Sequence, residues 1–328
     1  MATMESIPLI NADFLFSSGT NALQILLLGK TGSGKSSLAN TIFGDLEEFN
    51  VTHSAGSTTK VCQTKTETVN GRKLRLIDTP GLFDTDRDNT MFSRDNVKLL
   101  IECASGVHAF LILLKVEKFT KHEKQVTENL LKQFTKQALK YTTVVFTHGD
   151  QLPDEETIES WVEDKKKMKA MVEKCGGRCH VFDNKYWNHR DPSEYPVKNN
   201  QVQIENLLNT IEETVTQNGG RCYTNKALQM IEKVIQHVQA KDPQMSRESA
   251  KEIVHKNLWP KFKYMVIGCT TASVLVGAIA LPCSVFLIPS ALIGAAVIGG
   301  AVTAGSLVGS VGGLVAGKVS KEKKEKQS

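Results

Sequence analysis

The sequence predicts an α/β fold in which helices cover both faces of a mostly parallel sheet. Short apolar or β-prone runs alternate with amphipathic stretches over residues 23–217. Such apolar runs are typical of strands buried on both faces. The first of these strands leads into a glycine-rich loop and then into a helical pattern. Strand–helix alternation of this kind favours parallel strands that are joined by helical crossovers.

The individual elements follow from the position of each run. The expected strands cover residues 24–28, 74–77, 109–114, 142–146 and 180–182, and the expected helices cover 35–43, 95–104, 121–138, 158–175 and 202–217. A further amphipathic section, residues 225–258, carries apolar residues at helical spacing. Pro243 predicts a break within that section, which therefore forms one or two helices.

Composition narrows the class of protein. The chain has 328 residues, of which 41% are hydrophobic and 23% charged, and its formal net charge is +5. Five lysines and two glutamates in residues 318–328 supply +3 of this charge. Because the rest of the chain is nearly neutral, we expect no nucleic-acid partner. Seven scattered cysteines fit a reducing compartment better than a disulfide framework.

One long segment of the chain is uncharged. Residues 264–317 contain no Asp, Glu, Lys, Arg or His, and these 54 residues suffice for two membrane spans and a turn. Lysines flank the segment on both sides, and Lys prefers the cytoplasmic side of a membrane. The sequence thus predicts a hydrophobic membrane hairpin, either spanning or re-entrant, with both ends in the cytosol. The endoplasmic reticulum, a lipid droplet and the mitochondrial outer membrane fit equally well.

The loop after the first expected strand carries phosphate-binding chemistry. Residues 29–37 read GKTGSGKSS and match the pattern G-x-x-x-x-G-K-[ST] between a strand and a helix. Glycines let such a loop wrap phosphate groups, and N–H groups at the helix N-terminus supply positive potential. Lys35 is expected to reach the β- and γ-phosphates, and Ser36 to ligate Mg²⁺. The expected nucleotide contacts in this loop are Gly29, Lys30, Thr31, Gly32, Ser33, Gly34, Lys35, Ser36 and Ser37.

A second motif, DTPG at residues 78–81, follows the expected strand at 74–77. A carboxylate at this place can hold Mg²⁺ through water, and the amide of Gly81 can then meet the γ-phosphate. The polar loop at 54–60, SAGSTTK, lies between the two motifs, and Thr59 or Thr58 is its expected metal-sensing hydroxyl. The predicted metal ligands are therefore Ser36, Thr59 and Asp78.

The residues after the strand at 142–146 suggest which base is bound. The carboxylate of Asp150 can accept two hydrogen bonds from N1 and N2 of guanine, a pattern that adenine cannot offer. Most GTPases place Asn-Lys before this Asp, whereas here His148 and Gly149 precede it. His148 is expected to pack on the purine or to bond it through its ring. Asn184, just after the strand at 180–182, is expected to close the far side of the base.

Together these motifs resemble the immunity-associated protein (IMAP) GTPases, relatives of septins and chloroplast-import receptors. The similar blocks are GKTGSGKSS, DTPGLFDT, GVHAFLILLKVEKFTKHE, FTHGDQL and RCHVFDNK, within residues 23–217. The resemblance implies a P-loop NTPase G domain that binds GTP or GDP with Mg²⁺ and that self-associates across its nucleotide face. The family usually carries basic residues before the guanine-reading Asp, and in this respect His148 and Gly149 depart from it.

We accordingly divide the chain into an N-terminal extension (1–22), a G domain (23–217), a helical extension (218–263), the hydrophobic segment (264–317) and a basic tail (318–328). Leu82 stands where Ras-like proteins place a water-orienting Gln, so slow hydrolysis is expected and the catalytic residue stays unassigned. Two functions remain open: a slow GTPase that acts as an assembling switch on a membrane, and a GTP-bound membrane scaffold with negligible hydrolysis. A phosphate-loop kinase is a remote third, because residues 78–88 contain only one Arg.

Overall fold

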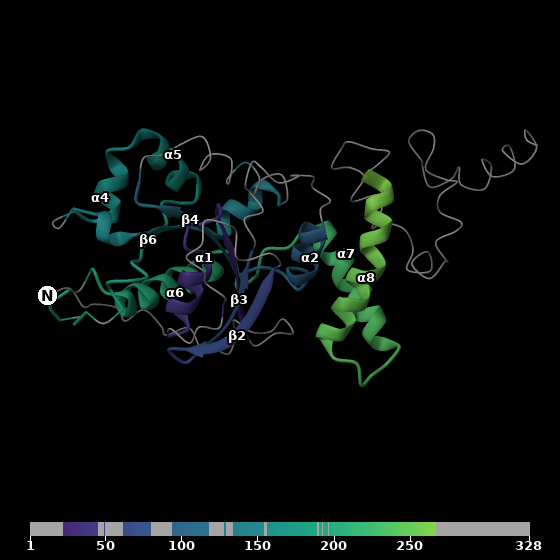
Figure 1. The fold of residues 1–328 in the computed structure, drawn as a ribbon. Helices are drawn as coiled ribbons and strands as arrows, with labels where there is room; N and C mark the ends of the chain where they lie inside the picture. Colours follow the sequence, from purple (N-terminus) through teal and green to yellow (C-terminus); the bar gives the residue numbers. More distant parts are fainter. Residues whose placement is uncertain are drawn as a thin grey trace, which may run out of the picture.

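The computed structural model describes residues 22–44, 49, 62–79, 94–117, 128, 134–153, 156–188, 190–191, 193–195 and 197–266. These residues form a six-stranded sheet in the order β2-β3-β1-β4-β5-β6 (Figure 1). The strands are β1 (Leu23–Leu28), β2 (Gln63–Val69), β3 (Arg72–Asp78), β4 (Ala109–Lys115), β5 (Thr142–Thr147) and β6 (Cys179–Val181). All neighbouring pairs are parallel except β2–β3. The predicted mostly parallel α/β sheet is thus confirmed.

The central strands form because their sequences are apolar on both sides. Every residue of β1 and of β5 is buried, as are six of the seven residues of β4. Successive side chains point to opposite faces, so Leu26 and Leu28 join one apolar cluster while Ile25 and Leu27 join the other. The two clusters are the cores on the two faces of the sheet.

Helices cover both of these faces. They are α1 (Lys35–Ile42), α2 (Arg94–Glu102), α4 (Ile158–Glu163), α5 (Lys166–Lys174), α6 (Asn200–Gln217), α7 (Lys226–Ala240) and α8 (Arg247–Val266). Apolar residues of α1 and α6 pack on one face, and those of α2, α4, α5, α7 and α8 on the other. Helices α7 and α8 lie side by side against α2 (Figure 1).

Three local predictions need correction. Strand β2 was missed because its sequence, QTKTETV, is polar; it pairs antiparallel with β3 through a tight turn at Asn70 and Gly71, which both have positive φ. The single helix expected at 158–175 is two helices, α4 and α5. Of the helix expected at 121–138, the structure describes residues 128 and 134–138, and a 3₁₀ helix covers Lys136–Tyr141.

The predicted membrane anchoring is wrong for the part of the chain that the structure describes. Within that part, no helix has both the length and the apolar character needed to cross a membrane. Helix α8, which leads toward the uncharged segment, carries charged side chains along its length, among them Glu248, Lys251, Glu252 and Lys256. For the described residues, this finding contradicts the predicted membrane-anchored localisation. Most of the predicted hairpin, the basic tail, and residues 1–21 lie outside the described residues.

Candidate nucleotide-binding site

The predicted nucleotide contacts gather at one edge of the sheet. The phosphate loop follows β1, Asp78 ends β3, residues 148–150 follow β5, and Asn184 lies just after β6. These four strands are parallel, so their carboxyl ends meet at the same edge. The phosphate loop leaves β1 between β3 and β4, where the strand order reverses, which is the usual ligand position in such sheets. Thr59 and Gly81 lie outside the described residues.

The phosphate loop has the shape that its glycines permit. Gly32 and Gly34 have φ of 75° and 84°, a left-handed conformation that side chains rarely adopt. A Cβ on Gly29 would lie 2.8 Å from the carbonyl oxygen of Leu113, so this position also requires glycine. The buried Lys35 Nζ donates to the carbonyl oxygens of Gly29 and Lys30, at 3.0 Å each. The ammonium group is thus held within the loop, where phosphate charge would gather.

Two of the predicted metal ligands are in direct contact. The hydroxyl of Ser36, on the first turn of α1, donates to Oδ2 of Asp78 at 2.5 Å, and Asp78 is fully buried at the end of β3. Hydroxyl and carboxylate oxygens are ligands that Mg²⁺ prefers in proteins. The donor set therefore fits a magnesium ion beside the phosphate loop.

The loop after β5, residues 148–150, is expected to read the base and is called the base-reading loop. A hydrogen bond at the end of β5 connects this region to the phosphate loop. The hydroxyl of Thr147, the last residue of β5, donates to the carbonyl oxygen of Ser33 at 3.0 Å. His148 adopts a left-handed backbone (φ 61°), and its Nδ1 lies 3.2 Å from the Thr147 hydroxyl oxygen. Burial, together with the positive charge of Lys115, lowers the pKa of His148, so the ring is neutral at neutral pH.

Asp150 has a carboxylate neighbour that the sequence analysis missed. The backbone N–H of Asp150 donates to Oδ2 of Asp183 at 3.2 Å, and Oδ1 of Asp183 accepts the backbone N–H groups of Lys185 and Tyr186 at 3.0 and 2.6 Å. The hydrogen bond between the two side chains raises the pKa of Asp150. Burial opposes ionisation of Asp183, but its hydrogen bonds outweigh burial and lower its pKa. Of the two carboxyl groups, Asp150 is therefore the one that binds a proton first as the pH falls.

Buried polar atoms surround these loops. In the part of the chain that the structure describes, Ser33 Oγ, Asn184 Oδ1 and Trp187 Nε1 are buried and have no hydrogen-bond partner in the protein. The Nδ2 of Asn184 lies 3.2 Å from the position of a Cβ on Gly34, so Asn184 reaches from the end of β6 to the phosphate loop. Buried polar groups normally find partners, and a ligand rich in donors and acceptors would supply them here. The site therefore fits a nucleotide.

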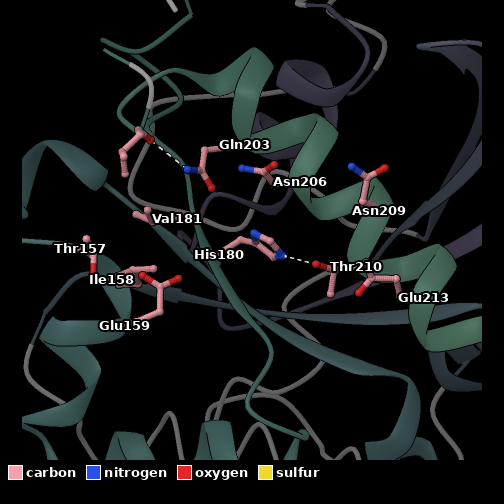
Figure 2. Close-up of a pocket in the computed structure, with 11 residues that line it drawn as sticks. Thr157, Ile158, Glu159, His180, Val181, Gln203, Asn206, Asn209, Thr210 and Glu213 are labelled. Carbon is pink, nitrogen blue, oxygen red and sulfur yellow. Dashed lines mark hydrogen bonds between the residues drawn. The ribbon is translucent and has the colours of Figure 1, made fainter. Parts of the chain in front are cut away.

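A second cavity lies away from this edge. It has a volume of about 520 Å³ and opens between α4, β6 and α6 (Figure 2). His180 and Thr210 line it and share a hydrogen bond of 2.9 Å, and burial lowers the pKa of His180 to about 4. None of the predicted nucleotide contacts is among its described lining residues. The cavity lies along the outer edge of β6 and is separate from the nucleotide site.

The mostly parallel sheet carries a phosphate loop after its first strand, and Ser36 of the following helix contacts Asp78 at the end of β3. This arrangement is that of a nucleotide-binding G domain of the phosphate-loop class. Residues 23–242 match the model of the AIG1 family. The chain belongs to this family and contains its GTP-binding G domain. The resemblance to IMAP GTPases is thereby confirmed.

Several curated proteins are similar to the chain. Immune-associated nucleotide-binding protein 7 of Arabidopsis thaliana is 30% identical over 251 residues, which cover 74% of this chain and 78% of that protein. Immune-associated nucleotide-binding protein 13 of the same plant is 33% identical over 201 residues, 61% of this chain and 57% of that one. GTPase IMAP family member 8 of Rattus norvegicus is 32% identical over 202 residues, 61% of this chain but only 28% of its own length.

Among solved structures, Toc33 from Arabidopsis thaliana in complex with GDP and Mg²⁺ aligns with a TM-score of 0.47 and 23% identity, covering 60% of this chain and 86% of that one. Toc33 in complex with Mg²⁺ and GMPPNP aligns with a TM-score of 0.46 and 22% identity, covering 60% and 85%.

Proposed function

We propose that this protein is a slow GTPase that acts as a GTP-dependent assembling switch. One observation carries the proposal: the described phosphate-loop groups and the Ser36–Asp78 pair lie at the same edge of the sheet as the carboxylate of Asp150. The phosphate loop alone would fit ATP equally well. Asp150, in the short 3₁₀ turn that follows β5, is the group that favours guanine.

The phosphate half of the site has clear roles for its residues. Lys35, whose Nζ bonds two loop carbonyls, is placed to neutralise the β- and γ-phosphates. Backbone N–H groups at the start of α1 add positive potential. Ser36 and Asp78, with Thr59 as a further proposed ligand, would hold Mg²⁺, which neutralises phosphate charge when bound. Gly81 stays the proposed donor to the γ-phosphate.

The base half of the site would discriminate by hydrogen bonding. The ionised carboxylate of Asp150 would accept from N1 and N2 of guanine. The neutral ring of His148 would pack on the purine, and Asn184 would close the opposite side with its amide.

Hydrolysis is proposed to be slow because Leu82 cannot orient a water molecule. Self-association across the nucleotide face is the proposed source of the missing catalytic group. Helices α7 and α8, which pack on α2, are proposed to be a helical extension of the G domain.

The test is a calorimetric titration of the purified chain with GTP, GDP and a non-hydrolysable ATP analogue, with mass followed by light scattering. We expect Asp150→Asn to weaken GTP binding by about a hundredfold or more, and to favour xanthosine triphosphate, whose 2-oxo group accepts from an amide. Asp164→Asn, at the exposed end of α4, removes the same charge and is the control. Equal affinity for the ATP analogue would refute guanine recognition. A mass that does not depend on the nucleotide would refute the switch and favour the scaffold.

A further inference from the structure

Trp187 lies against the base-reading loop, and no motif in the sequence indicated this contact. The side chain is almost fully buried, with 1% of the residue exposed. Its six-membered ring packs on Gly149: a Cβ on Gly149 would lie 2.6 Å from Cη2 and 2.8 Å from Cζ2 of the indole. Real Cβ atoms essentially never approach other atoms this closely, so a side chain at position 149 would force the indole or the loop to shift.

The backbone at position 149 does not itself require glycine. Gly149 is not among the described glycines with positive φ, so an alanine there would meet no conformational penalty of the kind found at Gly32 or Gly34. The close contact with the indole, and not the backbone conformation, is therefore the obstacle to a side chain at this position. A larger residue at 149 would therefore displace either the indole of Trp187 or the loop itself.

Both partners of this contact are fixed by hydrogen bonds. The N–H of Gly149 donates to the carbonyl oxygen of Phe182 at 3.0 Å, which ties the loop to the end of β6. Asn200, the first residue of α6, donates its backbone N–H to the carbonyl oxygen of Trp187 at 3.3 Å and its Nδ2 to that of Asp183 at 2.6 Å. Asp183 in turn holds the backbone N–H of Asp150. The start of α6 thus supports the indole and the neighbour of Asp150 together.

We propose that Trp187 is a positioning residue for guanine recognition: its indole packs on Gly149 and sets the path of residues 148–150, which carry Asp150. The inference rests on the proposed reading of guanine by Asp150. A short 3₁₀ turn, Gly149–Gln151, carries the carboxylate, so a displaced backbone displaces the carboxylate with it. Hydrogen bonds to a base weaken steeply when donor and acceptor move apart by a few tenths of an ångström or lose alignment.

The test is a double-mutant cycle in the full chain with Gly149→Ala and Trp187→Leu. Overpacking a rigid contact displaces the backbone, so Gly149→Ala is expected to raise the dissociation constant for GTP by about tenfold or more. Trp187→Leu alone is expected to weaken GTP binding. In the Trp187→Leu background, Gly149→Ala is expected to change the dissociation constant for GTP by less than about twofold. The two positions would then be coupled through the indole.

Binding of a second ligand distinguishes a positioning role of Trp187 in base recognition from a general role in folding. Inorganic triphosphate reports on the phosphate loop without a base, and its affinity is expected to stay within about twofold of the parent value in all variants. Trp161→Leu is the matched control, because Trp161 is buried on α4 and its ring contacts Phe146 and Lys165, whereas the nearest atoms to a Cβ on Gly149 all belong to Trp187. It should lower stability and leave the ratio of GTP to triphosphate affinity unchanged.

Three contrary results of these binding experiments can be told apart. An equal effect of Gly149→Ala in both backgrounds would overturn the role of Trp187. A parallel loss of triphosphate binding would show a purely structural contact, and would overturn it too. If the parent protein bound GTP and an ATP analogue equally, the proposed function itself would fail, whatever the result of the cycle.

Discussion

Replacing Lys251 by methionine is predicted to destabilise the fold, because Lys251 joins α8 to the sheet through a buried ionic cluster. The Nζ of Lys251 lies 3.0 Å from Glu102 on α2 and 3.0 Å from Glu248, and the lysine side chain is 3% exposed. Arg75 of β3 contacts the same Glu102 carboxylate at 2.6 Å. Methionine keeps the length of the side chain and removes its charge, so Glu102 retains one cationic partner.

The expected loss of stability depends on the ion pair that Glu102 keeps in the Lys251→Met variant. Removing one partner of a buried ion pair costs about 3–5 kcal/mol when the other charge is left alone. Because Arg75 still contacts Glu102, and because methionine fills the space, we expect a loss of about 2 kcal/mol in the free energy of unfolding. Burial raises the pKa of Glu102, but Lys251 and Arg75 outweigh burial, and the net pKa is lowered. The stabilisation is therefore present above the usual Glu pKa and is lost as the pH falls through the lower folded-state pKa.

Urea denaturation followed by circular dichroism measures this difference at neutral pH and at about pH 4, where carboxylates begin to protonate. The difference between the parent protein and Lys251→Met should shrink at the lower pH. Lys256→Met is the control, because Lys256 is exposed on the same helix and the charge change is identical; it should cost less than about 0.5 kcal/mol. A loss from Lys251→Met no greater than that of the control would refute the reasoning.

Three further predictions concern the site and the fold. Affinity for GTP should fall on mild acidification, because the pKa of Asp150 is raised and its protonated carboxyl cannot accept both bonds; Asp183→Asn should move this fall to lower pH in calorimetric titrations. Tyr223→Phe should cost about 1–2 kcal/mol in urea denaturation, because the Tyr223 hydroxyl accepts the Thr135 N–H at 3.0 Å; an unchanged midpoint would contradict this. Asn225→Ala removes the N-cap of α7 and should cost about 1 kcal/mol in thermal unfolding.

The sheet was predictable where burial dictates composition. Strands β1, β4 and β5 are buried on both faces, and their apolar runs show this directly. Strand β2 is an edge strand with mostly half-exposed or exposed residues, so its pattern of Thr, Lys and Glu carries no such signal. Its pairing depends on β3, to which the turn at Asn70 and Gly71 returns the chain. Residues 164–165, which separate α4 from α5, contain no Gly or Pro, so no helix-breaking residue marks this break in the sequence.

The phosphate half of the site was predictable because nearly all its chemistry lies within nine consecutive residues, 29–37. The partner from β3, Asp78, ends a recognisable strand, and the structure places it against Ser36. Local sequence is sufficient here because a loop and a helix N-terminus supply most of the phosphate contacts by themselves.

The base half of the site is assembled from three separate segments, and this is why sequence reasoning found only part of it. Asp150 and Asn184 were proposed from the sequence because each follows a strand at a recognisable place. Asp183 and Trp187 act through contacts with the loop after β5, and neither contact has a local signature. The departure at position 149 looked like a weakened guanine motif when only the loop was considered. With the indole of Trp187 packed against it, the same glycine is the residue that lets the loop and the end of β6 pack together.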